Sequence, residues 1–521
     1  MRTKAIYYND YSGGLNDTTH QREIKRNEAS LLRNWDITYK GQLKRRDGLT
    51  SKGSFSGKTI YGLHSFMRTT GAEDLLAMAD DYLYYNSSGT TWTALDTGFS
   101  SGIDFSFATV SYNDRVYMCN EDNQLHYWDR VSTTQNACLT DLGAAVPHGN
   151  VTLWHKNHLF HANNVTYSGA TYENELYWSA FGDPSTYDTT TDKISLPGGG
   201  RLITIADWGD ALVIFKEHSI MFLTGWGDAD WSVTASASGL TNIDEAVGTI
   251  SPKGVTRVGN EIWFIDDEAQ IRRLYKTQLD TFRRDIVSTK IQTTISGINK
   301  AYLHLATAWT FNDKVFFSVP NGSDTRNSLV LVYDLIASKR TGEEAWTTYT
   351  GWNIDFATTY PTSTTPDLYL ASKYTTYVYR FYGDDDNGTA IDARWDGKED
   401  DFGNPDTYKR FKWGRITGSA DSADVDVTFH SSVDDADFAN LGNLNLQTSG
   451  GTLGPTGTFE LGPTGTTAIL SSAGSGDLDF YYSSGGGSVT GRTLMHSVRH
   501  AVASEQPSVN GYTSHIGERN I

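Results

Sequence analysis

The chain of 521 residues contains little cysteine, little proline and no long apolar run. Its two cysteines, Cys119 and Cys138, are too few for a disulfide scaffold and lack metal-ligand spacing, so we expect two buried thiols. No stretch approaches the ~18 apolar residues of a membrane-spanning helix. Polar residues follow the short start "MRTKAIYY", so we expect no secretory signal and a cytosolic origin.

Positive charge is scarce as well. The chain has 43 Lys and Arg against 62 Asp and Glu, a formal net charge of −19. A protein that wraps nucleic acid needs cations that neutralise phosphates, so this composition argues against that class. It is compatible with a wall past which DNA slides, because a like-charged surface repels the duplex.

The residues that are abundant in the sequence are typical of short strands joined by tight turns. Gly (50), Tyr (29) and Trp (14) are abundant, and short aromatic or β-branched runs alternate with Ser, Thr, Asp and Asn. One pattern recurs seven times: a polar turn, an alternating apolar strand, a second turn and another aromatic strand, as in "GNEIWFIDDEAQIRRLY" (259–275). Equivalent positions are separated by 33, 43, 53, 50, 53 and 53 residues and are Leu83, Val116, Leu159, Leu212, Ile262, Val315 and Leu368.

This period predicts an all-β fold built around a β-propeller. Each unit can form three or four strands, and a small isolated sheet is only marginally stable in water. Packing such sheets around an axis buries both of their faces. We expect about seven blades in residues 51–383, six or eight also fitting the irregular spacing. Runs such as "RLITIADW" predict the strand before each repeat, with "ND", "KN", "GD" and "GN" as hairpin turns.

The two ends of the chain differ in composition. Residues 384–521 alternate as in "DVDVTFHSS", which predicts a C-terminal antiparallel β domain of sandwich type with a Gly-rich hairpin at "GPTGTFELGPTGTT" (454–467). Residues 1–50 carry ten Lys or Arg and six Asp or Glu, a net charge of +4. There we expect a short helix in "REIKRNEASLLRN" and a hairpin with "YKGQ" as its turn, completing the propeller.

Two motifs invite a metal interpretation, and we prefer a structural one for both. On a strand, the three-residue steps of "WHKNHLFH" put His155 and His161 on one side and His158 on the other, so we expect surface or blade-edge histidines. "GDDDNGT" (383–389) has three consecutive aspartates where a calcium loop has ligands at alternate positions, and Trp395 stands where such a loop has glutamate. We expect a solvated turn.

Motifs of known chemistry are incomplete or missing. "NSSGTTWTAL" shares Gly89 and Trp92 with the Asp-box turn of sialidase-like propellers, but Ser87 and Tyr85 replace the aspartate and serine of that box. The sequence has no G-x-S-x-G, Walker A or G-x-G-x-x-G motif. We expect no catalytic residue, no metal and no cofactor.

An ordered series of motifs resembles one family. "GGLN…RNEASLLRNWDITYKGQLKRRDGL", "ITIADWGDALVIFKEHSIMFLTG" (203–225), "GTISPKGVTRVGNEIWFIDDEAQIRRL" (248–274) and "KRFKWGRI" (409–416) are similar to motifs of tail hub or nozzle proteins of short-tailed bacteriophages, also called packaged-DNA stabilisation or stopper proteins. The resemblance covers most of residues 13–275 and touches 385–416. The hairpin at 454–467 departs from the family pattern.

The resemblance implies a structural virion protein rather than an enzyme. Such subunits form a ring, usually a hexamer, below the portal and adaptor, and the ring lines or closes the DNA exit channel and takes part in genome retention and ejection. It implies assembly in the host cytoplasm and passing double-stranded DNA that is not bound by sequence. We expect Lys40, Lys44, Arg45 and Arg46 to dock an acidic neighbour, so that glutamate at 44–46 weakens assembly and leaves the monomer folded.

Two other classes stay open. The aromatic residues and acidity fit a carbohydrate-binding or carbohydrate-degrading propeller, in which tryptophans and paired carboxylates would converge in one cleft. The Gly/Ser/Thr-rich C-terminal hairpins fit a tail-tip adhesin for a host receptor, which is more often trimeric. Subunit count and glycan cleavage separate these classes from a hexameric hub.

Overall fold

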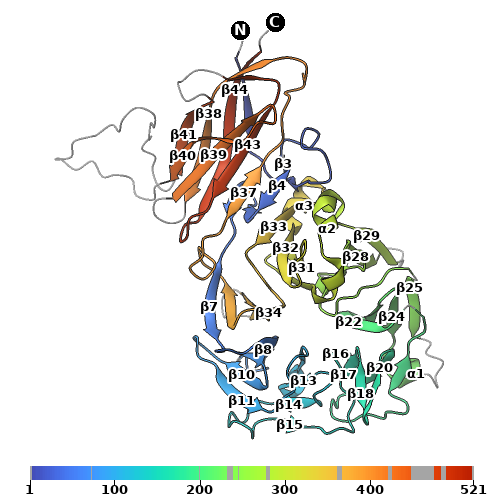
Figure 1. The fold of residues 1–521 in the computed structure, drawn as a ribbon. Coiled ribbons are helices and arrows are strands. Elements are labelled where there is room, and N and C mark those ends of the chain that lie inside the picture. Colours follow the sequence, from blue (N-terminus) through green and yellow to red (C-terminus); the bar gives the residue numbers. More distant parts are fainter. Residues whose placement is uncertain are drawn as a thin grey trace, which may run out of the picture.

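In the computed structural model, residues 3–71, 73–198, 200–231, 239–244, 246–276, 282–360, 366–420, 425–446, 475–482 and 489–518 are described. The chain forms a β-propeller followed by a C-terminal antiparallel β domain, which confirms the predicted fold class (Figure 1). None of the helices in these ranges is long and apolar enough to cross a membrane.

The described residues form seven propeller blades of four strands each. Blades one and two contain β8 (Ile60–Met67), β9 (Glu73–Ala79), β10 (Tyr82–Asn86), β11 (Thr93–Thr97), β12 (Ser106–Val110), β13 (Arg115–Cys119), β14 (His126–Trp128) and β15 (Thr140–Asp141). Blades three and four contain β16 (Val151–His155), β17 (His158–Ala162), β20 (Glu175–Trp178), β21 (Lys193–Ser195), β22 (Leu202–Trp208), β23 (Ala211–Lys216), β24 (Ile220–Thr224) and β25 (Leu240–Asp244). Blade three also carries a small hairpin, β18 (Val165–Tyr167) and β19 (Ala170–Tyr172).

The remaining blades bring the chain back to its N-terminal segment. Blades five and six contain β26 (Val255–Val258), β27 (Glu261–Ile265), β28 (Ile271–Lys276), β29 (Phe282–Ile286), β30 (Thr307–Phe311), β31 (Lys314–Pro320), β32 (Asn327–Asp334) and β33 (Trp346–Thr350). Blade seven contains β34 (Phe356–Tyr360), β35 (Asp367–Ala371), β36 (Tyr377–Phe381) and, as its outermost strand, β7 (Leu49–Ser54). The first strands contact one another in a closed circle, β8–β12–β16–β22–β26–β30–β34 and back to β8, and surround the central axis.

The predicted repeat corresponds to the second strand of six blades. From Val116 in β13 to Leu368 in β35, the equivalent positions all lie in second strands. Leu83 is the exception, because it lies in β10, the third strand of blade one, and the true counterpart is β9. This shift by one strand accounts for the first, short interval of 33 residues.

The predicted hairpin turns join paired strands, and two of them have the backbone geometry of a two-residue hairpin turn. Lys156 and Asn157 have φ of 47° and 63°, and Asn312 and Asp313 have φ of 46° and 58°. Positive φ at both central residues gives the turn whose twist matches that of the flanking strands.

In the parts of the chain that the structure describes, helices are few and short. They are α1 (Asp228–Trp231), α2 (Gln292–Ser296) and α3 (Leu335–Thr341), with 3-10 turns at Ser111–Asn113, Thr289–Ile291 and Lys300–Leu305. The helix predicted within residues 22–34 is wrong: β3 (Glu28–Ala29) and β4 (Leu31–Arg33) occupy its second half. Leu32 is buried between partly exposed neighbours, a two-residue period imposed by sheet pairing that overrides helical propensity.

The C-terminal domain is a sandwich of two sheets. Its strands are β37 (Ala393–Asp396), β38 (Lys409–Ala420), β39 (Val425–Val433), β40 (Ala439–Leu446), β41 (Ser475–Tyr481), β42 (Val489–Gly491), β43 (Leu494–His500) and β44 (Pro507–Glu518). One sheet has the order β41-β38-β44-β6-β5, with β1 on β44 and β42 on β38. The other, β37-β43-β39-β40, continues through β4 into blade six as a single sheet of nine strands.

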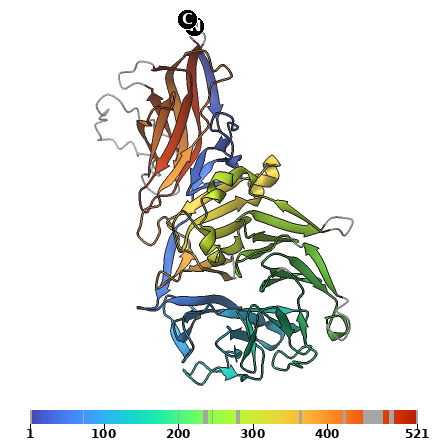
Figure 2. The same ribbon diagram turned by 45° about the vertical axis from the view of Figure 1, so that its right-hand side comes forward.

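The N-terminal segment joins the two domains, and we call residues 3–54 the strap. Its strands are β1 (Thr3–Tyr8), β2 (Gly14–Leu15), β3, β4, β5 (Trp35–Ile37), β6 (Leu43–Arg45) and β7. The strands β1, β5 and β6 belong to the sandwich, β4 lies between β33 and β37, and β7 closes blade seven. The chain thus divides differently from the predicted boundaries at 50 and 383, since only the end of the strap completes the propeller (Figures 1 and 2).

Hydrophobic packing follows the same connections. A separate apolar cluster fills the space between most neighbouring blades, as with Trp128 between blades one and two. The cluster between blades five and six is different, because it runs on through Leu32 and Trp35 of the strap to Phe429 and Phe480 of the sandwich. The two domains therefore share one continuous hydrophobic core.

Candidate functional site

The structure separates the four predicted interface residues. Lys40 is exposed in the turn between β5 and β6, and Lys44 is partly exposed on β6. Arg45 and Arg46 are both 0% exposed. The expectation that these two arginines dock a neighbouring subunit is therefore wrong, because groups of the same chain surround them.

Arg46 is held on every side of its guanidinium. Its terminal nitrogens donate to the Asp386 carboxylate at 2.9 and 2.6 Å, and its Nε donates to the Asn34 side chain at 2.9 Å. The guanidinium carbon also lies 4.4 Å from the ring centroid of Trp352. A paired, stacked and hydrogen-bonded arginine of this kind fixes the segments that it joins.

Arg45 completes the contact with the acidic turn Gly383–Thr389. Its terminal nitrogens donate to the backbone carbonyls of Val502 (3.1 Å) and Asp384. Burial lowers the pKa of Arg45 from its ordinary value. The turn predicted to be solvated therefore contacts both Arg45 and Arg46, and it offers them the Asp386 side chain and the Asp384 carbonyl oxygen.

Other cations of the strap also pair within the chain. Arg22 donates to Glu399 at 2.8 Å and to Asp435 at 2.6 Å, and Arg26 donates to Asp400 at 2.5 Å. All three carboxylates belong to the C-terminal domain. The basic character of the strap thus stabilises the connection between the two domains.

The three predicted histidines lie on a hairpin, with His155 on β16 and the other two on β17. We expected exposed or blade-edge side chains, but all three are buried. His155 Nδ1 lies 2.6 Å from an oxygen of Asp207, and His158 Nδ1 lies 2.6 Å from the carbonyl oxygen of Ser179. In the described parts of the chain, no three His, Cys, Asp or Glu side chains gather in a way that could hold a metal ion.

His161 is the most deeply enclosed of the three. Its Nε2 lies 2.8 Å from the Tyr187 hydroxyl and its Nδ1 lies 3.2 Å from the Thr152 hydroxyl. Burial lowers the pKa of His161 to about 3. The ring is therefore neutral in the folded chain at pH 5, whereas a histidine in an unfolded chain is mostly protonated there.

His161→Gln is expected to flatten the acid dependence of stability. Between pH 6.5 and 3 the unfolded chain binds a proton at His161 that the folded chain does not, so the stability present above pH 6.5 is lost as the pH falls. One proton corresponds to about 1.4 kcal/mol per pH unit, and the variant should lose that much slope between pH 6 and 4. Urea titrations at several pH values measure it. The exposed His20→Gln is the control, and an unchanged slope in His161→Gln would contradict the assignment.

Both cysteines are buried and free, as predicted. Burial raises the pKa of each thiol, to about 11 for Cys119 and to about 11 for Cys138. Neither is therefore a thiolate at neutral pH, which fits a packing role.

A cavity of about 470 Å³ occupies one mouth of the central axis. It is lined by the segments that lead into the inner strands of blades two to six, together with Lys373 of blade seven. The two carboxylate oxygens of Asp104 form ion pairs with the ammonium nitrogens of Lys253, at 2.7 Å, and Lys373, at 2.6 Å. Burial alone would raise the pKa of Asp104, but the two ammonium groups hold it below the usual value.

The two ion pairs of Asp104 cross this mouth of the central axis. Asp104 precedes the inner strand of blade two, Lys253 precedes that of blade five, and Lys373 lies between β35 and β36 of blade seven. The propeller axis is therefore bridged by charged side chains at this end. Sequence patterns did not reveal the three residues, because they stand in loops and come together only once the register of the blades is known.

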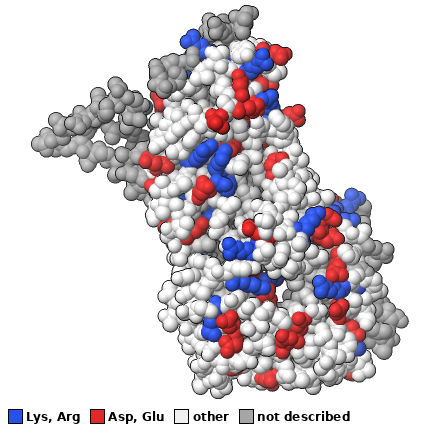
Figure 3. All heavy atoms as spheres, in the orientation of Figure 1, with Lys and Arg blue, Asp and Glu red and all other residues white. Residues whose placement is uncertain are grey.

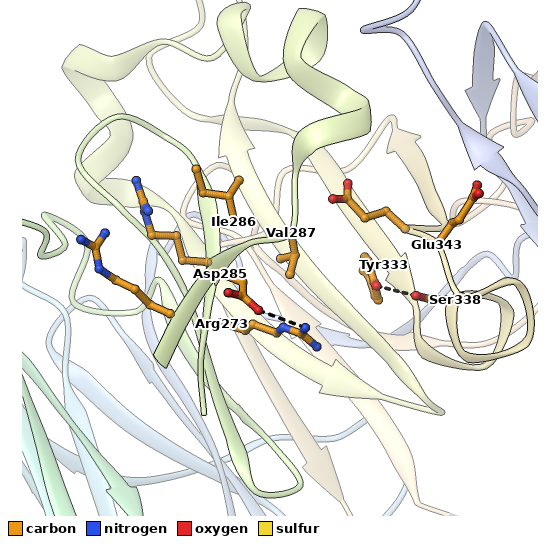
Figure 4. Close-up of a pocket in the computed structure, with 11 residues that line it drawn as sticks. Arg273, Asp285, Ile286, Val287, Tyr333, Ser338 and Glu343 are labelled. Carbon is orange, nitrogen blue, oxygen red and sulfur yellow. Dashed lines mark hydrogen bonds and ion pairs between the residues drawn. The ribbon is translucent and has the colours of Figure 1, made fainter. Parts of the chain in front are cut away.

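A second hollow lies on the side of the propeller, between blades five and six (Figure 4). Its volume is about 830 Å³. Arg273 lies on one wall and donates to Asp285 at 3.3 Å, while Tyr333 and Ser338 share a hydrogen bond on the other wall. Glu343, at its rim, pairs with Lys25 of the strap and with Lys290. The described charges thus have partners within the chain, and the hollow shows no catalytic arrangement.

The Gly-rich hairpin predicted at residues 454–467 lies outside the described residues. Its role as a gate, docking loop or decoration stays a prediction.

No family model matches this chain, and no curated protein matches it. Among solved structures it is similar to the WD40 β-propeller domain of Doa1, with 8% identity, a TM-score of 0.40, and 64% of this chain and 97% of that one covered. It is also similar to PorZ of Porphyromonas gingivalis, with 9% identity, a TM-score of 0.38, and 64% and 37% covered. The AfRom2 CNH domain gives 10% identity, a TM-score of 0.36, and 64% and 98% covered. Each likeness concerns the fold alone.

Proposed function

We propose that this chain is a structural subunit of a bacteriophage tail. In this proposal, copies assemble side by side into a ring, a hexamer, below the portal and adaptor. The ring lines or closes the channel through which double-stranded DNA leaves the particle, and takes part in genome retention and ejection. The proposal starts from the ordered motif series in residues 13–275 and Lys409–Ile416.

The observation that supports it most is the single sheet of nine strands that runs from blade six into the sandwich. A ring that retains DNA under load needs subunits that do not bend between their domains. Here β4 of the strap pairs with β33 on one side and with β37 on the other. Any bending between propeller and sandwich would break this ladder and the shared core.

The channel in this proposal is the axis of the ring, not the axis of the propeller. The Asp104 pairs with Lys253 and Lys373 bridge the propeller axis. A net charge of −19 suits a channel wall, because each contact between a cation and a phosphate would add salt-dependent affinity and slow the passage of DNA.

The mass of the assembled particle tests the proposal. Native mass spectrometry of the purified chain, with negative-stain images of the same sample, should show a six-fold ring whose central hole admits a duplex. A trimer would favour the receptor-binding adhesin instead. A chain that remains monomeric at all concentrations would overturn the proposal, and glycan cleavage by that monomer would favour the carbohydrate-degrading class.

A further inference from the structure

We propose that an arginine row on the nine-stranded sheet docks an acidic surface of the neighbouring copy in the ring. The row consists of Arg33, Arg394 and Arg499. This inference rests on the proposed function and deepens it, since it assigns one side of the contact between subunits.

Strand register places the three arginines directly opposite one another. Arg33 on β4 is paired with Arg394 on β37, and Arg394 is paired with Arg499 on β43. The residues that alternate with them, such as Trp395 and Val498, are buried in the core. The arginines therefore share the outer face of the sheet, and Figure 3 shows Lys and Arg side chains gathered on that part of the sandwich.

Three like charges in one cross-strand row destabilise the isolated sheet. The chain compensates only part of this repulsion. Asp392 forms an ion pair with Arg33, and the two carboxylate oxygens of Asp396 accept from guanidinium nitrogens of Arg394 at 2.9 and 2.7 Å. Among the described residues, Arg499 has no carboxylate partner, and its Nε donates to the hydroxyl of Ser497 at 3.2 Å.

One aromatic ring holds two of the guanidinium groups in place. Arg394 and Arg499 lie 5.6 and 5.2 Å from the ring centroid of Phe438. Burial and the charge of Arg394 lower the pKa of Arg499, and burial with both arginines lowers that of His430 beside them. The guanidinium of Arg499 is thus fixed by stacking while its terminal nitrogens remain available, an arrangement that suits a carboxylate from outside.

The row fits an acidic protein surface better than DNA. Three arginines against their two paired carboxylates leave a net charge of only +1 in the row itself, whereas phosphate binding grows with the number of cations that contact the backbone. A second copy is the occupant that charge complementarity favours, because the chain has 62 acidic against 43 basic residues.

Substitution of Arg499 separates docking from folding. Arg499→Gln removes one charge from the row, so the monomer should melt at the same temperature or higher, since repulsion falls. Self-association should weaken about tenfold at low salt, and this difference should shrink at high salt. Arg257→Gln, which breaks an exposed ion pair with Asp207 on the propeller, is the matched control. Sedimentation velocity over a concentration series and thermal melts give both readouts.

The outcomes are distinguishable. A wild-type chain that never associates overturns the ring and this inference together. If the wild type forms a ring, and neither Arg499→Gln nor the double variant Arg394→Gln/Arg499→Gln weakens its assembly, this inference alone is overturned. Binding of a labelled 30-base-pair duplex that is lost in the Arg499 variant, with association unchanged, would assign the row to DNA and overturn it. A lower melting temperature in Arg499→Gln would show a structural role and overturn it as well.

Discussion

Replacing Arg46 by methionine is expected to lower the free energy of unfolding by about 3–5 kcal/mol, the usual cost of removing one partner from a buried ion pair. Methionine keeps the length and apolar stem of the side chain, so little packing volume is lost. Asp386, whose side chain is 12% exposed, would keep only the Trp352 indole at 3.1 Å among the side-chain partners described here. The Asn34 and Trp352 contacts of the guanidinium would be lost as well.

Urea unfolding of the purified monomer measures this loss. Lys40→Met is the control, because Lys40 is exposed in the same segment and a surface substitution usually changes stability by less than about 0.5 kcal/mol. Adding Asp386→Asn to Arg46→Met should recover part of the loss, since the unpaired charge is then gone. Equal stability of Arg46→Met and Lys40→Met would show that the buried pair is unimportant.

The same pair corrects the expectation for the triple glutamate variant of Lys44, Arg45 and Arg46. Glutamate at 46 would face the Asp386 carboxylate inside the protein, and glutamate at 45 would face carbonyl oxygens. We therefore expect the monomer itself to unfold, so that any effect of this variant on assembly would say nothing about docking.

Replacing Gly48 by alanine is expected to open the closure of blade seven and cost about 3 kcal/mol. A Cβ at Gly48 would lie 2.0 Å from the carbonyl oxygen of Asp385, and that atom belongs to the backbone. The strap and the acidic turn would have to separate. Three backbone hydrogen bonds join them here: Gly48 N to Gly383 O (2.7 Å), Leu49 N to Asp385 O (2.9 Å) and Asn387 N to Leu49 O (2.7 Å). Each contributes about 1 kcal/mol.

Limited proteolysis and thermal melting measure this opening. Gly227→Ala is the matched control, because a Cβ there has no atom within 4 Å and the backbone does not have positive φ. We expect Gly48→Ala to be cleaved sooner within residues 49–54, whereas Gly227→Ala should resemble the wild type. Cleavage of both variants at the wild-type rate would show that the closure tolerates the added methyl group.

The sequence predicted the strands and turns that are determined by residues close together in the chain. The inner strands, such as "RLITIADW" at β22, and the paired positive-φ turns could be identified because alternation and turn residues specify them within ten residues. The hairpin between β5 and β6 was predicted for the same reason. The blade count followed from the repeat, although the first unit was placed one strand too late.

Long-range pairing could not be predicted in the same way. The partners of β4 are β33 and β37, more than 300 residues away, and no local signal distinguishes such a strand from the short helix that Ile24, Leu31 and Leu32 indicated. For the same reason, the sequence did not show which groups Arg45 and Arg46 contact in the folded chain. A cluster of cations in a sequence shows that anionic partners are needed, but it does not show whether they belong to the same chain or to another one.

The path of the strap has a consequence for synthesis of the protein. The strands β1 and β7 find their partners, β44 and β36, only after several hundred further residues have been made. During translation the strap must wait unpaired while blades one to six form, and neither domain closes until its distant strand has left the ribosome. Such non-local pairing slows the last folding step and exposes strand edges to aggregation until then. A chain terminated before β36 would lack a closed propeller, and one terminated before β44 would lack a complete sandwich, so only full-length copies would present both surfaces on which an assembly depends.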